Sequence, residues 1–145
     1  MKTLLVFFAT LFFLGCSAPN NPPKTFTGVV QQDALHNIKI ITFPEVTGQT
    51  VPYGISVIQR PNLPDMYVVY MKVDSIEWAH AENGDKLPII PLAEMSNSMG
   101  IKLSLAFLEK NQNRNPQITV FGAKNSAVIV LPDYYIKGVL QYMHQ

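Results

Sequence analysis

The sequence contains a single cysteine, Cys16, among its 145 residues. An exported chain with one cysteine cannot form an internal disulfide, so core packing has to stabilise its fold. If Cys16 is modified, as its position described below indicates, no thiol remains for nucleophilic catalysis or for metal binding. The scarcity of cysteine therefore excludes disulfide-rich domains, thiol enzymes and cysteine-ligated metal centres.

Charged side chains are also scarce, at 14% of the residues. Without the first fifteen residues, which include Lys2, ten basic side chains remain of 11 in the whole chain, against 10 acidic ones, and Lys and Arg form no run. A neutral surface of this kind lacks the electrostatic footprint of nucleic-acid-binding proteins and the basic face of proteins that bind anionic lipid. The sequence therefore predicts no nucleic-acid partner.

Long hydrophobic runs are missing as well. The longest extends from Leu4 to Leu14 and is interrupted by Thr10, with Lys2 before it and Gly15 after it. A membrane-spanning helix needs roughly 18 or more apolar residues, which this run does not reach. A positive start, a short apolar core and a small residue before a cleavage site are typical of a secretory signal. We therefore interpret residues 1–15 as a signal peptide.

The end of that segment, Phe13-Leu14-Gly15-Cys16, resembles the lipobox of bacterial lipoproteins. The resemblance implies cleavage before Cys16 and lipidation of this residue, with palmitate among its acyl chains, so that the protein is anchored to a membrane. An Asp directly after the cysteine retains such lipoproteins in the inner membrane, and here that position is Ser17. The resemblance therefore implies the outer membrane, facing the periplasm. The alternative is a signal peptide cut elsewhere, with Cys16 incidental.

The segment after the cysteine is rich in proline and asparagine and separates the anchor from the rest of the chain. Residues 16–25 contain three prolines and two asparagines. Proline holds such a segment near polyproline II, at about 3.1 Å per residue, so we interpret it as a short tether. Residues 26–145 are then about one domain's worth of chain.

Beyond the tether, short apolar segments alternate with Pro, Gly and Asn. This pattern predicts a mainly β domain, an antiparallel sandwich or partly open barrel of about seven or eight strands, with a short C-terminal helix. The expected strands are residues 26–31, 37–43, 53–59, 66–80, 86–92, 101–107, 118–121 and 127–131.

Three of these strands carry more detailed expectations. In residues 66–80 the apolar positions change parity after Val73, which predicts a bulge or bend at Asp74-Ser75. Asn83-Gly84 predicts a tight hairpin turn, and the two prolines in residues 86–92 place that strand at a sheet edge. The continuous apolar run in residues 127–131 predicts a strand covered on both faces.

The segment between the strands at 86–92 and 101–107 is ambiguous. Residues 92–100 fit either a helical turn or a loop, because helix formers precede Ser96-Asn97-Ser98. Strict alternation predicts that residues 101–107 form a half-buried strand. Residues 109–117 are polar and are expected to form a solvated turn.

The C-terminal segment changes to helical periodicity. Asp133 is suited to cap a helix, and residues 133–144 then present one apolar stripe, formed by Ile136, Val139, Leu140 and Met143. This stripe either docks on the domain or contacts a partner helix, so we regard its residues as candidate partner-binding residues. A final strand is the alternative for this segment.

No catalytic constellation is evident. The densest titratable group is Glu77 to Asp85. In a strand His80 and Glu82 would project to one face and Asp85 could return across the hairpin, so that a histidine and a carboxylate could form one corner of a metal site. Because no third protein ligand is identifiable, a polar hairpin end is the preferred interpretation, and no metal or cofactor is predicted. Ser56 lacks the second glycine of a nucleophile elbow. The tyrosines and Trp78 suit either an interface or a sheet, and we favour the sheet.

These features together predict a non-catalytic binding or assembly module of the cell envelope with a protein partner. Small lipoproteins of this type include secretion pilotins, entry-exclusion factors and subunits of envelope complexes. The alternative is a carrier of a small molecule or lipid, which requires an internal apolar cavity, and an enzyme of unknown type comes third. An interaction module should have a filled core and an exposed apolar patch, whereas an enzyme should have converging titratable groups.

Overall fold

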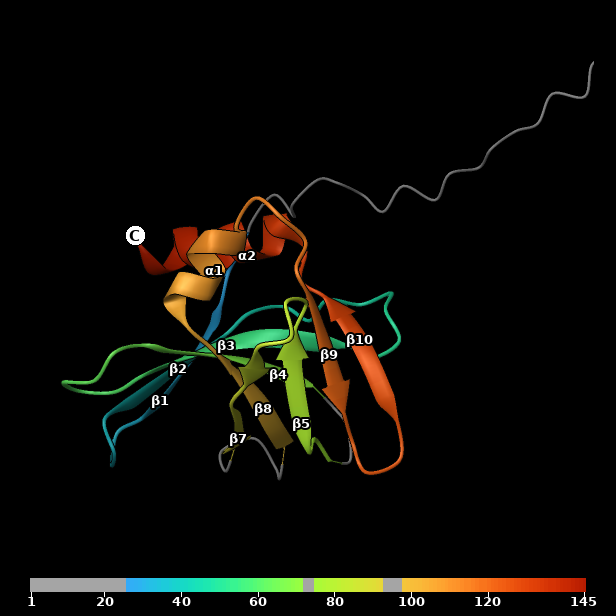
Figure 1. The fold of residues 1–145 in the computed structure, drawn as a ribbon. Helices are drawn as coiled ribbons and strands as arrows, with labels where there is room; N and C mark the ends of the chain where they lie inside the picture. Colours follow the sequence, from blue (N-terminus) through green and yellow to red (C-terminus); the bar gives the residue numbers. More distant parts are fainter. Residues whose placement is uncertain (1–25, 72–74, 93–97) are drawn as a thin grey trace, which may run out of the picture.

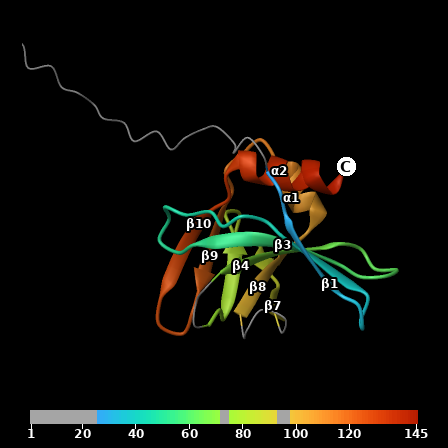
Figure 2. The same ribbon diagram turned by 180° about the vertical axis from the view of Figure 1, so that it is seen from behind.

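The computed structural model describes residues 26–71, 75–92 and 98–145. These ranges form two antiparallel sheets, with two helices together at one end (Figures 1 and 2). The strands are β1 (Val29–Asp33), β2 (Ile38–Thr42), β3 (Tyr53–Gln59), β4 (Met66–Met71), β5 (Trp78–Ala81), β6 (Lys86–Leu87), β7 (Ile89–Leu92), β8 (Ser98–Leu103), β9 (Gln117–Phe121) and β10 (Ser126–Val130), and the helices are α1 (Leu105–Asn111) and α2 (Asp133–Met143). The mainly β, sandwich-like class is confirmed, although the described ranges contain more strands than predicted.

The larger sheet has six strands in the order β1-β2-β3-β4-β8-β7, and the smaller has four in the order β10-β9-β5-β6. Neither of these described sheets closes into a barrel. Strands β3 and β4 lie in the middle of the larger sheet and are buried on both faces along nearly their whole length. Their Ile-, Val- and Tyr-rich sequences favour such positions. In the described residues, no helix has the length and apolar composition needed to cross a membrane.

The main core lies between the two sheets and extends under the helices. One face of β3 contributes Tyr53, Ile55 and Val57, and the facing strands of the smaller sheet contribute small and branched side chains. The largest fully buried side chains of the described ranges are those of Tyr53, Phe43, Ile55, Met71, Ile101, Leu103, Leu108, Ile118, Ile129, Leu131, Ile136 and Val57. This dense packing supplies the stability that disulfides would supply in a cysteine-rich domain.

A second, smaller apolar cluster occupies the opposite face of the six-stranded sheet. It is formed by Ile40, Ile58, Val68, Tyr70 and Leu92. Gly100 on β8 makes this cluster possible, because a Cβ atom there would overlap Val68 and Leu92 from the two neighbouring strands. Leu92 can therefore reach across β8 toward Val68.

The predicted single strand over residues 66–80 is wrong. β4 ends at Met71 in the larger sheet, and β5 begins at Trp78 in the smaller one. Met71 and Ile76 are both buried in the main core, so the change of parity marks the passage from one sheet to the other. Of the expected bend, Asp74 lies outside the described residues, and Ser75 belongs to the connection.

Residues 86–92 also divide between the sheets. Pro88 separates β6 from β7, and both are edge strands, as the prolines predict. The Asn83-Gly84 turn is confirmed, because the Gly84 N–H donates to the Ala81 carbonyl at 2.9 Å and Gly84 has φ +87°. Glycine adopts such a positive φ without steric cost.

The strand expected over residues 101–107 ends early, and the following segment is a helix. β8 stops at Leu103, and Ser104 caps α1 by accepting a hydrogen bond from the Phe107 N–H at 3.0 Å. Leu108 then enters the main core with no exposed surface. The strand prediction failed here because a strand pattern and a helix pattern cannot be distinguished over so few residues. α1 then continues to Asn111, into the segment that was predicted to be a solvated turn. The rest of the ambiguous segment, residues 93–97, lies outside the described residues.

The C-terminal hairpin is confirmed, but the coverage predicted for its second strand is wrong. β9 and β10 pair with Val128 opposite Thr119. β10 is an edge strand of the smaller sheet, in which Ile129 is buried and Val128 is 47% exposed. An apolar run alone does not reveal whether a second layer covers it.

Candidate binding surfaces

The predicted lipidation site, Cys16, lies outside the described residues, as do the signal peptide and tether. Its modification stays a prediction. The structure does describe Phe26, which is the residue directly after the tether. Its ring stacks on Phe43 with centroids 5.2 Å apart and meets Tyr135 of α2 edge to face at 5.3 Å. The domain therefore begins at the end of the molecule that carries the helices.

The helix predicted for the C-terminal segment is confirmed as α2, and its apolar stripe faces the protein's own core. Ile136, Val139 and Leu140 are buried, and Met143 is half-buried against the same cluster. The packing of these candidate partner-binding residues agrees with the docked alternative. Their role toward a partner stays an untested prediction.

The capping of α2 differs from the expectation. Pro132 occupies the N-cap position, and Asp133 is the first helical residue. The Asp133 carboxylate accepts hydrogen bonds from the Tyr134 N–H at 2.7 Å and from Lys137 Nζ at 3.1 Å. The Lys137 contact, and after it the Tyr134 contact, lowers the pKa of Asp133 below its usual value. Asp133 therefore stabilises the first turn as a negative charge near the helix N-terminus.

Three of the six tyrosines, Tyr53, Tyr70 and Tyr135, are core residues whose hydroxyls have hydrogen-bond partners. Tyr135 donates to the Pro44 carbonyl at 2.8 Å and accepts from the Ile55 N–H at 3.0 Å. Tyr70 donates to the Phe43 carbonyl at 3.2 Å. Burial raises the pKa of the Tyr135 hydroxyl well above its usual range. These contacts tie the hydroxyls to backbone groups of the domain's own core, which is a structural role.

The titratable group at Glu77 to Asp85 does not converge. His80 Nδ1 lies 2.8 Å from the Ala81 carbonyl, and the Asp85 carboxylate accepts from the Asn83 side chain at 2.6 Å. Within residues 26–71, 75–92 and 98–145, no three His, Cys, Asp or Glu side chains are close enough together to hold a metal ion. The group forms the polar end of a hairpin.

The outer face of the smaller sheet is the most distinctive exposed surface. We call it the aromatic face and define it by Trp78, His80, Thr119 and Phe121. Trp78 on β5 lies opposite Phe121 on β9, and their rings stack with centroids 3.8 Å apart and planes 5° apart. His80 tilts against both rings, at 5.5 and 5.7 Å.

None of the side chains of the aromatic face is buried, and Trp78 is 42% exposed. No other described element covers this side of the sheet (Figure 1). Sequence inspection identified Trp78 but not the stack, because Phe121 is distant in sequence and its own segment is short. The sequence does contain one indication of an exposed aromatic surface. Trp78 and His80 alternate with alanines in this strand, and the alanines occupy the inward positions.

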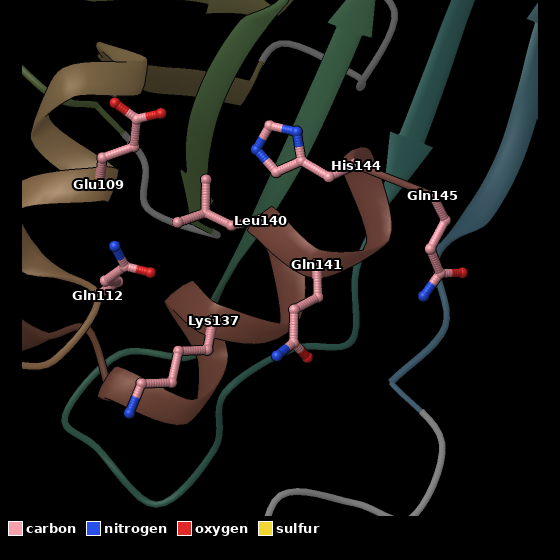
Figure 3. A pocket seen from close by; sticks show the side chains of 7 residues that line it. All are labelled: Glu109, Gln112, Lys137, Leu140, Gln141, His144 and Gln145. Carbon is pink, nitrogen blue, oxygen red and sulfur yellow. The ribbon is translucent and has the colours of Figure 1, made fainter.

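Two open clefts lie elsewhere on the surface. One, of about 490 Å³, lies beside α1 and α2, where Leu140 is surrounded by polar side chains that do not converge on one point (Figure 3). The other, of about 910 Å³, lies between residues 50–51 and the β9–β10 hairpin. It is lined by Thr50, Val51, Met71, Ser75, Val120, Gly122, Ala123, Lys124, Asn125, Ser126 and Ala127.

In comparisons with known proteins, no family model, curated sequence or solved structure matches this chain.

Proposed function

We propose that this protein is a non-catalytic binding module of the cell envelope, anchored through Cys16, whose contact surface for a protein partner is the aromatic face. The observation that carries the proposal is the exposed stack of Trp78 on Phe121. Among the described residues, Trp78 is the only exposed aromatic side chain, and the others are buried or half-buried. The position of this pair on an uncovered sheet face is therefore the feature that core packing does not explain.

The stack is suited to bind a partner with little loss of entropy. Each aromatic side chain can bury about 150–250 Å², and the cross-strand pairing already restricts the rotamers of both rings. A contact surface that is ordered before binding loses less conformational freedom when the partner docks. Tryptophan is also among the residues most often found at the energetic centre of an interface. Thr119 and His80 supply polar atoms at its edge.

The anchor and the aromatic face are compatible with each other. Phe26 is fixed against α2, so a tether of ten residues would leave from the helical end and reach about 30 Å at most. The aromatic face belongs to strands of the smaller sheet, below the helices in Figure 1. A partner in the same membrane or in the periplasm could then approach it without displacing the helices.

The two alternatives have weaker support. Both clefts are open to solvent and carry polar side chains, whereas a lipid carrier needs an enclosed apolar cavity. Among the described residues, the carboxyl groups with shifted pKa values are those of Asp33 and Asp133. His36 and Lys137 respectively are the main causes of the lowered pKa values, and each is a local surface contact. These two pairs offer no converging acid and base.

The test is photo-crosslinking in native envelopes, with a photoreactive amino acid at Thr119 and identification of the captured protein. Trp78→Ala should weaken capture strongly, because truncation at an interface centre costs about 2 kcal/mol or more, roughly thirtyfold in affinity. Leu63→Ala is the matched control, because Leu63 is 58% exposed in the turn between β3 and β4, away from the aromatic face. Equal capture by parent, Trp78→Ala and Phe121→Ala proteins would refute the proposal.

A further inference from the structure

The edge of the smaller sheet has backbone groups that no described residue pairs. The Leu131 N–H donates to the Pro116 carbonyl at 3.0 Å, and the Gly122 N–H donates to the Asn125 carbonyl at 2.8 Å. In an antiparallel ladder the residues that bond to the partner strand alternate with residues that do not. Ala127 and Ile129 therefore turn their backbone toward β9, and Ser126, Val128 and Val130 turn theirs outward.

One outward position is already occupied, and its occupant resembles a peptide group. Gln49 Nε2 donates to the Val130 carbonyl at 2.9 Å, and the Val130 N–H donates to Gln49 Oε1 at 3.0 Å. A carboxamide carries the same donor and acceptor as a backbone amide. This pair thus reproduces the two-bond pairing that an added strand would make. Two residues earlier, the N–H and carbonyl of Val128 have no partner among the described residues.

The other edges of the two sheets carry features that discourage strand addition. β7 contains Pro91, β6 has only two residues and includes Lys86, and β1 ends in Asp33. Short strands, charges and prolines are the usual protection of sheet edges. β10 has neither a charge nor a proline in its five residues. It is an unprotected edge, apart from Gln49 at its end.

This edge borders the larger cleft. Ser126 and Ala127 form one side of the cleft, and Thr50 and Val51, which follow Gln49 in the chain, form another. The apolar part of the lining includes Met71 and Val120, and among the described lining residues Lys124 is the charged one. The cleft therefore offers backbone pairing along one side, an apolar surface for alternate side chains and a cation at the hairpin end.

We infer that the cleft binds an extended segment of a partner protein, which adds to the smaller sheet as a strand beside β10. Its backbone pairs with the N–H and carbonyl of Val128, its alternate small apolar side chains enter the cleft, and an acidic group lies near Lys124. The inference rests on the proposed function, since it names how a partner of this binding module is held.

The chain's own tether is a poor occupant. Residues 16–25 contain three prolines, which cannot donate to a ladder, and their only charge is Lys24. A like charge near Lys124 would be unfavourable. Phe26, where the described domain begins, is held against α2. A separate protein segment without basic residues fits the lining better.

The test uses a displayed library of random seven-residue peptides, selected on the full-length protein held in lipid nanodiscs. Enriched peptides, synthesised individually, should bind the parent and Val128→Thr proteins alike. They should bind Val128→Pro about tenfold more weakly, because proline removes the outward N–H and one net hydrogen bond is lost. This N–H has no partner within the described domain, so Val128→Pro should melt close to the parent. Should it fail to fold, amide exchange in the parent provides the readout, and the Val128 N–H should exchange more slowly with peptide present.

Three results would overturn the inference. They are the enrichment of no peptide, equal binding of the peptides to the proline and threonine variants, and dimerisation of the protein through β10 that the proline variant abolishes. The last result would make a second copy of this chain the occupant. Trp78→Ala separates this test from that of the proposed function. If the peptides need the Val128 N–H but no envelope protein is captured at Thr119, the cleft is still supported as a peptide-binding site. The aromatic face is then refuted as the contact surface for a partner.

Discussion

Replacing Gly138 by alanine tests whether the packing of α2 outweighs its helix propensity. In a helix interior alanine is more favourable than glycine by about 1 kcal/mol, so propensity alone predicts a more stable protein. In the structure, however, a Cβ atom at position 138 would lie 2.7 Å from both Cδ1 and Cγ of the Phe26 ring. Carbon atoms do not approach so closely, and the ring would have to move.

The displacement of Phe26 would disturb its contacts with Phe43 and Tyr135. Overpacking of this kind costs about 1–3 kcal/mol, and aromatic contacts contribute about 0.5–1.5 kcal/mol per pair. After the gain in propensity is subtracted, we expect Gly138→Ala to lower the free energy of unfolding by about 1 kcal/mol. For a domain of this size that corresponds to a decrease of roughly 4 °C in Tm.

The decisive comparison is a double-mutant cycle with Phe26→Ala, measured by urea and thermal denaturation. Phe26→Ala removes the three atoms that lie nearest to a Cβ atom at position 138, so Gly138→Ala should stabilise the Phe26→Ala protein by about 1 kcal/mol. The effect of the same substitution thus reverses sign between the two backgrounds. If Gly138→Ala stabilises both proteins equally, the contact between Phe26 and α2 does not exist as described.

Three further predictions concern the helix and the anchor. Leu140→Asp should unfold the domain, because an unpaired charge is not tolerated among buried apolar side chains; a variant that melts like the parent yet loses its captured partner would instead identify the α2 stripe as a partner site. Asp133→Asn should destabilise the protein near pH 7. Because the folded-state pKa of Asp133 lies below its unfolded value, the difference from the parent should shrink as the pH falls through that lowered pKa in acid titrations of stability. Cys16→Ser should abolish fatty-acid labelling and membrane retention, and labelling that persists would show that Cys16 is not the lipidated residue.

Local periodicity was sufficient for several elements. The change from alternation to helical spacing after Pro132 correctly predicted α2 and the residues of its apolar stripe. The hairpin of β9 and β10 and the strand at Tyr53 followed from alternation and from turn residues. In each case the segment's own pattern agrees with its environment in the fold, so that nearby residues carry enough information.

Other elements could not be predicted in this way. The segment around Ser104 satisfies alternation and helical spacing equally well, and the burial of Leu108 decides between them. The parity change after Val73 was detected, but nothing near it indicates that the chain passes to a second sheet. Whether β10 is central or at an edge depends on whether another strand pairs with it, which its apolar sequence does not state.

The candidate surfaces show the same division. The sequence by itself determined the single cysteine, the lipobox-like segment, the scarcity of charge and the short alternating strands, because these are properties of neighbouring residues. Only the tertiary structure decided that Trp78 stacks on Phe121, that Gln49 occupies one position of the β10 edge, and that the backbone groups of Val128 have no partner among the described residues. The physical reason is that strand order and register bring distant segments together, and these depend on the packing of the whole core rather than on any local pattern.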